Sequence, residues 1–431
     1  MSLADTMVDA TLTFYDILRT KAETGERFEL QPYMDKLTSE IIGRVVFDKD
    51  VFPQRKSHPI IQLLTQRVRL MPSSDAIFPW QGVDLLRPLK LFLNGRKLDS
   101  AISKELDEKI RRRSEQRALE ELTESHVAKK RSIIDIALNA CEKEASGING
   151  RSHGQIMNPQ DLPKSVRSDI VSSIKTFIFA GTDTTSSTLC WVIYLLHRYP
   201  EAFAKLKAEL DDYLPHNLAD AAARIKEDPY IMNKLEYTAA VFRETLRIFP
   251  PASTLRYEIP NGYVIERETK AKIPMLPGTN VWCVSHMIHR NKRFFPQPLE
   301  FIPERFIPSQ TPFPEAELFT EAGKDAFRPF EKGPRNCIGQ EMAMLEGKIF
   351  LALIAREFDF VLEHPGEDPN VRYPTPESTV EEFSESTEYG RAIREGKVNR
   401  DRVEGHRAFP RHLGSASPDG GCPGRLYFRK R

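Results

Sequence analysis

Apolar residues in the first half of the chain recur at spacings of three and four, which is typical of α-helices with one buried face. This spacing predicts early helices over residues 3–20, 34–47, 60–70 and 102–122. It then predicts one long helix ended by Pro200 and two shorter ones after it, over residues 165–199, 201–213 and 234–249. Residues 145–158 are polar and contain glycine, which favours an exposed loop.

The periodicity changes after the pair Pro250-Pro251. Residues 253–284 are rich in β-formers broken by turn residues, which predicts a small irregular sheet. Residues 294–330 hold many Pro and Phe without a sustained period and indicate a packed coil, whereas residues 341–358 again predict a helix. The tail from residue 364 carries a charged, insertion-like stretch over 377–405. We therefore predict a mainly α fold with a small mixed β region, as a single domain over residues 1–431.

Composition and charge narrow the class of protein. The 431 residues are 40% hydrophobic and 29% charged, which is a globular composition long enough to bury a substantial core. A net charge of +1 argues against a nucleic-acid partner, which would favour a basic excess. No apolar run reaches the length of about 20 residues that a membrane span needs, and the first ten residues do not resemble a signal peptide.

The cysteines are odd in number and widely scattered, with neither a metal-type Cys-x-x-Cys pair nor a disulfide framework: Cys141, Cys190, Cys283, Cys337 and Cys422. This usage favours a reducing compartment.

Cys337 lies in the segment with the strongest chemical pattern, Phe-x-x-Gly-x-Arg-x-Cys-x-Gly, immediately before a predicted helix. A lone cysteine is usually a buried structural residue. Here five positions match at once, namely Phe330, Gly333, Arg335, Cys337 and Gly339. The positive end of a helix dipole stabilises a thiolate, so Cys337 is placed to be a metal ligand. Glycines let a flat ligand approach the backbone, and the arginine could pair with an anionic group on that ligand.

Two other motifs carry polar groups where a core would be expected. Glu244 and Arg247 stand three residues apart on a predicted helix, a spacing that usually means a surface ion pair of little consequence. Residues 180–185 place Gly181, Asp183 and Thr184 inside an otherwise apolar helix. Without further information, that run is most simply a locally bent core helix whose hydroxyls bond its own carbonyls.

These three motifs resemble those of the cytochrome P450 family, the haem-thiolate monooxygenases. The Pro- and Phe-rich coil over residues 294–330 is most similar to that of microsomal enzymes of filamentous fungi. The resemblance implies a cytochrome P450 fold with haem between the helix at 180–185 and the Cys337 loop. It implies that Cys337 is the axial iron ligand, with Phe330 packed beside the sulfur and Gly333 and Gly339 shaping the loop. Arg335 would bind one haem propionate and Arg256 a second.

The resemblance also assigns roles away from the loop. Glu244, Arg247 and Arg305, the last from Pro-Glu-Arg-Phe at 303–306, would form a buried structural network. The central helix would open at its small residues, and the adjacent Asp183 and Thr184 would relay protons for oxygen activation. The substrate pocket would include Phe177, which could equally be a core residue, and Ala252, Ser253 and Thr254. Residues 414–431, with a turn at 418–420, resemble the family's last hairpin.

The implied function is insertion of one atom of O2 into a small apolar organic substrate, in fungal secondary metabolite biosynthesis. The implied cofactor is haem b, and NADPH electrons would arrive through a separate NADPH-cytochrome P450 reductase. The family implies the cytosolic face of the endoplasmic reticulum membrane; the chain as written, without an anchor, would be cytoplasmic.

Alternatives remain at this point. Family members carry a long segment before the part that matches residue 3 onward, including the anchor, early helices and further haem contacts. A chain without that segment is expected to express poorly and hold little haem, and it could be a non-catalytic remnant. A thiolate-haem isomerase or dehydratase is a third hypothesis, weakened by the Asp183-Thr184 pair.

Overall fold

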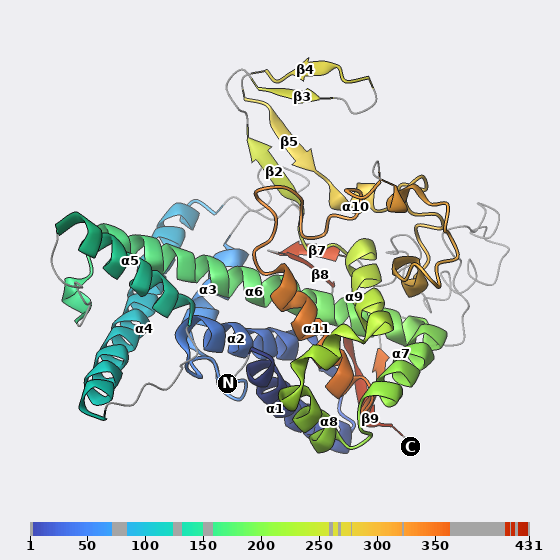
Figure 1. Cartoon of the computed structure of the whole chain (residues 1–431), viewed down its shortest axis with the longest axis horizontal. Helices are drawn as coiled ribbons and strands as arrows, with labels where there is room; N and C mark the ends of the chain where they lie inside the picture. The colour runs from blue at the N-terminus through green and yellow to red at the C-terminus, as the bar shows by residue number, and fades with distance from the viewer. Residues whose placement is uncertain are drawn as a thin grey trace.

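The computed structural model describes residues 3–70, 84–123, 132–149, 158–257, 262–265, 269–276, 278–320, 323–362, 410–413, 415–418 and 421–429. Most of these residues are helical, and the helices form one body (Figure 1). The helices are α1 (Leu3–Thr24), α2 (Gln31–Phe47), α3 (Pro59–Arg69), α4 (Arg87–Thr123), α5 (Ile133–Asn149), α6 (Lys164–Arg198), α7 (Pro200–Tyr213), α8 (Leu218–Glu227), α9 (Glu236–Ile248), α10 (Ser285–Ile288) and α11 (Gln340–Ile354).

Helix α6 crosses the middle of the body and belongs to both large apolar clusters (Figure 1). Its C-terminal half packs with α1, α9 and α11 in the larger cluster, where the Trp191 ring stacks on Phe249 at a centroid distance of 3.8 Å. The Trp191 indole N–H also donates to the Ala416 carbonyl oxygen at 2.8 Å. The N-terminal half of α6 packs with α2, α4 and α5 in the second cluster. Burial of apolar side chains therefore stabilises both halves of α6, one half in each cluster.

The strands form small antiparallel sheets at the edges of the helical body. One sheet has the order β1 (Phe28–Glu29), β9 (Pro423–Phe428), β6 (Phe358–Leu362). Three two-stranded ladders pair β2 (Thr254–Tyr257) with β5 (Asn280–Cys283), β3 (Tyr263–Ile265) with β4 (Lys272–Pro274), and β7 (Pro410–Leu413) with β8 (Ser415–Pro418).

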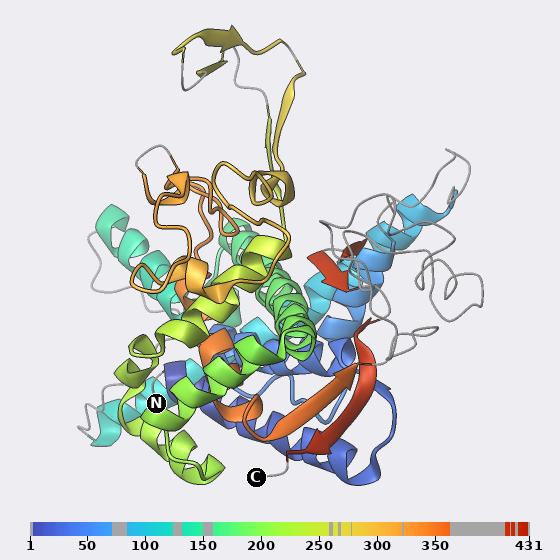
Figure 2. The same ribbon diagram turned by 90° about the vertical axis from the view of Figure 1, so that its right-hand side faces the viewer.

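The β2–β5 and β3–β4 ladders extend away from the body, as both views show (Figures 1 and 2). Leu255 and Trp282 are cross-strand partners in the β2–β5 ladder, and they are 56% and 65% exposed. Large apolar side chains at this level of exposure on adjacent strands form a surface that lacks a cover among the described residues.

The mainly α class with small sheets is confirmed, and the long central helix and the helices at α1, α2, α3, α7 and α9 agree with the sequence predictions to within a few residues. The prediction for α4 was too short, because this helix begins at Arg87 rather than residue 102. Helix α5 runs to Asn149, into the predicted loop at 145–158. Neither α5 nor α8 was predicted. The last predicted helix ends at Ile354, and residue 358 begins strand β6 instead.

The predicted final hairpin over 414–431 is wrong. Strand β8 pairs with β7, and β9 pairs with β1 and β6, so the two strands on either side of residues 419–420 do not pair with each other. Burial decides this pairing, because β9 covers α1 and joins the apolar cluster through Leu426. The charged stretch 377–405 lies outside the described residues. Within the described part of the chain, no helix has the length and apolar character required to cross a bilayer.

Candidate functional site

The Cys337 loop is a tight turn that is closed by a backbone hydrogen bond to its first residue, Phe330. The Cys337 N–H donates to the Phe330 carbonyl oxygen at 2.8 Å, and the Asn336 N–H donates to the Gly333 oxygen at 3.0 Å. Gly333 has a φ of 83°, a left-handed conformation that only glycine adopts without strain. Phe330 is partly buried against the larger apolar cluster, which anchors the start of the loop. The chain then enters α11 at Gln340.

The sulfur of Cys337 is accessible, in contrast with the usual fate of a lone cysteine. Cys337 is a free, exposed thiol, and the neighbouring Ile338 is 88% exposed. A Cβ added to Gly339 would stand 3.8 Å from the Cys337 sulfur, so a larger side chain there would cover the sulfur. An open thiol beside a glycine, at the start of an α-helix, could bind the iron of a flat cofactor that needs close contact with the backbone.

Two cationic side chains border this loop. Arg335 is exposed, and the Arg256 side chain on β2 is 45% exposed. The Arg256 Nη2 lies 3.9 Å from Glu331 Oε2. The exposed Arg335 is therefore open to an anionic ligand, whereas Arg256 already faces a carboxylate of the protein.

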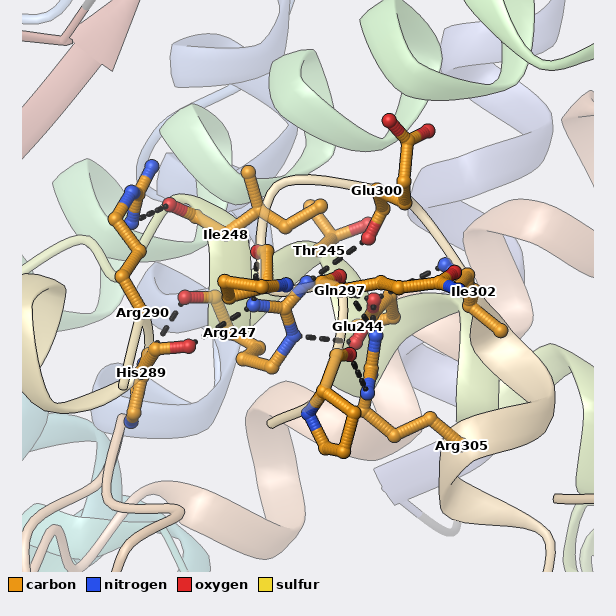
Figure 3. Close-up of polar contacts among 12 residues, drawn as sticks. Glu244, Thr245, Arg247, Ile248, His289, Arg290, Gln297, Glu300, Ile302 and Arg305 are labelled. Carbon is orange, nitrogen blue, oxygen red and sulfur yellow. Dashed lines mark hydrogen bonds and ion pairs between the residues drawn. The ribbon is translucent and has the colours of Figure 1, made fainter. Parts of the chain in front are cut away.

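Glu244, Arg247 and Arg305 form a network in which all three side chains are almost completely buried (Figure 3). Glu244 accepts from Arg247 Nε at 2.7 Å and Nη2 at 2.8 Å, and from Arg305 Nε at 3.3 Å. The remaining guanidinium N–H groups donate to backbone carbonyls of the coil at residues 289, 296, 297, 298 and 300. The network therefore fixes the path of a coil that has no regular secondary structure of its own.

His289 extends this network toward the Cys337 loop, and sequence analysis assigned it no role. Its Nδ1 lies 3.0 Å from the Arg247 carbonyl oxygen, and its Nε2 accepts from the Arg328 N–H at 3.1 Å. Burial, with the positive charge of Arg247, lowers the pKa of His289 to about 3. The imidazole therefore stays neutral, donating through Nδ1 and accepting through Nε2. The signal in the sequence that could have pointed to His289 is the pair His289-Arg290, which follows a predicted apolar strand.

Helix α6 is continuous through residues 180–185, so the expected opening at its small residues is not found. The Thr184 hydroxyl donates to the Ala180 carbonyl oxygen at 2.7 Å, within the helix. A built Cβ at Gly181 would come within 2.9 Å of the Ile42 side chain, so this glycine serves the close contact of α6 with α2. The small residue is therefore explained by helix packing.

Asp183 and Thr184 are neighbours in sequence but do not face each other, as expected for consecutive residues on a helix. Asp183 lines a cavity of about 380 Å³ between α2, α3, α6 and β8, whose lining does not include Thr184. Burial raises the pKa of Asp183 to about 6, and the negative charge of Asp35 adds to the rise. Its Oδ2 atom is buried without a hydrogen-bond partner among the described residues.

Asp35 is a second carboxyl on the same cavity that sequence analysis missed. It accepts from Ser186 Oγ at 2.6 Å and from Gln31 Nε2 at 3.0 Å. Burial raises the pKa of Asp35 as well. The cavity thus holds two carboxyls of raised pKa, which are suited to exchanging protons with water.

The expected pocket residues divide into two groups. Phe177 is partly buried against the second apolar cluster, as a core residue would be. Ala252 and Ser253 are exposed and Thr254 is half-buried, in the segment that leads into β2 beside the Cys337 loop.

Comparison with known proteins decides the family. The family model for cytochrome P450 matches residues 1–381. The chain is 33% identical over 370 residues to the cytochrome P450 monooxygenase acrF of Aspergillus aculeatus, covering 84% of this chain and 69% of that protein. It is 30% identical over 355 residues to the cytochrome P450 monooxygenase polC of Polytolypa hystricis, covering 82% of this chain and 59% of that protein.

This chain belongs to the cytochrome P450 family. It is thereby an oxidoreductase of the monooxygenase class whose cofactor is haem b, with O2 as co-substrate, electrons from a reductase and an organic substrate. A crystal structure of a cytochrome P450DA mutant heme domain shares the fold, with a TM-score of 0.62 at 19% identity, over 99% of this chain and 73% of that one. The alignments of this P450 chain therefore span 73% of that solved domain, and 69% and 59% of the two fungal relatives.

The buried network gives a stability prediction. Glu244→Gln removes the carboxylate that Arg247 and Arg305 share, and no other carboxylate among the described residues pairs with both of these buried guanidinium groups. The free energy of unfolding should fall by about 3–5 kcal/mol in urea denaturation. Glu317→Gln is the control, because Glu317 pairs with Arg293 on the surface at 2.6 Å and should cost below about 1 kcal/mol. Equal losses in the two variants would contradict the assignment.

Asp183 gives a pH prediction. A carboxyl with a pKa near 6 in the folded state and an ordinary value of 3.8 binds its proton more tightly when folded, so stability falls as pH rises through this window. Relative to Asp183→Asn, the wild-type protein should lose about 2 kcal/mol between pH 4 and pH 7. Denaturant unfolding at several pH values measures this, with the exposed Asp16→Asn as control. A wild-type difference from Asp183→Asn that stays constant with pH would show that Asp183 titrates normally.

Proposed function

We propose that this P450 inserts one oxygen atom of O2 into a small apolar organic substrate in fungal secondary metabolite biosynthesis, using Cys337 as the axial thiolate of haem b. The observation that supports it most is the open Cys337 sulfur beside Gly339 at the start of α11. The two fungal relatives named as monooxygenases support the reaction class and the fungal setting.

Bound haem supplies the oxygen-activating chemistry, and the loop residues prepare its site. Cys337 would supply the sulfur ligand from its place just before the first turn of α11. Phe330 anchors the loop, while Gly333 and Gly339 give the turn and the close approach. Arg335 and Arg256 would bind the propionates through charge-assisted hydrogen bonds.

Thr184 and Asp183 would serve proton delivery from different faces of α6. Thr184 would offer a hydroxyl on the haem side, and Asp183 would take protons from the water-accessible cavity lined by Asp35. A pKa near 6 suits a carboxyl that must both gain and lose a proton near neutral pH. Because the two side chains do not face each other, water or a local rearrangement of α6 would have to carry the proton between them.

The partner and location follow from the same proposal. Electrons would come from NADPH through an NADPH-cytochrome P450 reductase. The enzyme would work at the cytosolic face of the endoplasmic reticulum membrane.

The thiolate assignment is tested by spectroscopy of the haem-reconstituted protein. Reduced protein treated with carbon monoxide should show the red-shifted Soret band of thiolate ligation, and Cys337→Ala should abolish it. Cys283 is the next candidate for the iron ligand, and Cys283→Ala should keep the band. A band that survives in Cys337→Ala and disappears in Cys283→Ala would place the ligand on β5 instead.

The Thr184 role is tested by coupling. In Thr184→Ala, haem content should remain unchanged while a larger share of the consumed NADPH appears as hydrogen peroxide, because ordered proton delivery is lost. Thr176→Ala is a matched control, since its hydroxyl also bonds the helix backbone four residues earlier, at 3.0 Å. Unchanged coupling in both Thr184→Ala and the double variant with Thr185→Ala would remove this role.

A further inference from the structure

Glu331, between the first residue of the loop motif and Gly333, is an uncommon choice for its backbone conformation. Its φ is 61°, in the left-handed region that is strained for a residue other than glycine. Such strain persists only where the surrounding contacts fix it, and it concentrates at functional sites. The Glu331 side chain is also 8% exposed, although it carries a carboxylate. Something specific must hold this charge.

Four groups from two segments surround the Glu331 carboxylate. Arg328 donates from Nε to Oε1 at 2.8 Å, and its Nη2 is also bonded to Oε1. The Lys332 backbone N–H donates to the same oxygen at 3.2 Å. The other oxygen, Oε2, accepts from the Thr254 hydroxyl and lies 3.9 Å from Arg256 Nη2. One carboxylate oxygen of Glu331 therefore binds groups of the Cys337 segment, and the other binds groups of strand β2.

Strand β2 needs such a contact, because its ladder is thin and projecting. It pairs only with β5 among the described strands, and Leu255 on the same strand is 56% exposed. Arg328 is in turn fixed through its backbone N–H to the neutral imidazole of His289, whose Nδ1 bonds Arg247. Glu331 is thus the link between the buried network behind the loop and the strand beside it.

We propose that Glu331 is a positioning residue that locks β2, with Thr254 and Arg256, to the Cys337 loop, so that the substrate-facing wall and the thiolate side of the haem site form one unit. This proposal rests on the proposed function, since it takes Thr254 as a wall of the substrate pocket. It assigns to Glu331 control over the shape of that wall and over Arg256, and leaves iron ligation to Cys337.

The first test measures β2 directly, by hydrogen exchange of the peptide that contains residues 254–257. Glu331→Gln keeps the size of the side chain and removes its charge, so exchange in that peptide should become about tenfold faster, the factor expected for losing one charge-assisted hydrogen bond. Thr254→Val should have the same effect, Thr254→Ser should restore slow exchange, and the double variant Glu331→Gln/Thr254→Val should add little to either. Glu317→Gln, a surface carboxylate on the same coil, is the control.

The second test uses two iron-binding probes on the haem-loaded protein, imidazole and the larger phenylimidazole. In Glu331→Gln the dissociation constant for phenylimidazole should rise about tenfold, because the phenyl group needs the positioned wall, whereas that for imidazole should stay unchanged. The red-shifted Soret band of the carbon-monoxide complex should persist. Equal changes for both probes, or unchanged exchange in residues 254–257, would overturn the proposal. Loss of the thiolate band in wild type would instead contradict the proposed function, and Thr254→Val tests the link should Glu331→Gln fail to fold.

Discussion

The buried carboxylate of Glu244 is the contact on which the site depends. Two guanidinium groups converge on it without access to water, and each then reaches past it to backbone oxygens of the coil between α10 and α11. A coil has no ladder to satisfy its own carbonyls, so buried arginines take the place of the missing hydrogen bonds. Removing any member would leave a charge in a low-dielectric interior, and this penalty makes the arrangement all-or-none.

That coil connects the Glu244 network to the Cys337 loop. It leads directly into the Cys337 loop, which is followed by α11. His289 and Glu331 extend the same set of polar contacts, the first as a neutral imidazole between two arginines and the second as a strained carboxylate between two segments. The loop is therefore held by directional polar contacts on one side and by apolar burial of Phe330 on the other.

Helix α6 separates two environments whose chemistry differs. On one side, Asp183 and Asp35 share a cavity in which burial raises the pKa of both. On the other side lies the hydroxyl of Thr184, which is satisfied within the helix. In the proposed proton path, release of this internal bond would free the Thr184 hydroxyl, which would couple proton delivery to the conformation of the helix. The close contact of Gly181 with Ile42 limits how far the helix could shift toward α2.

The sequence by itself determined the features that depend on nearby residues, namely the helices and the motifs with fixed spacing. Helical periodicity located α6 to within a residue at each end, and fixed spacings identified Cys337 with its glycines and the Glu244-Arg247 pair, because these depend on neighbours a few residues away. Tertiary structure decided the rest. The partner of β9, the cavity that Asp183 lines, and the contacts of Asp35, His289 and Glu331 all depend on segments brought together from distant parts of the chain. A strand's choice of partner and a carboxyl's pKa are set by burial, which a one-dimensional pattern does not contain.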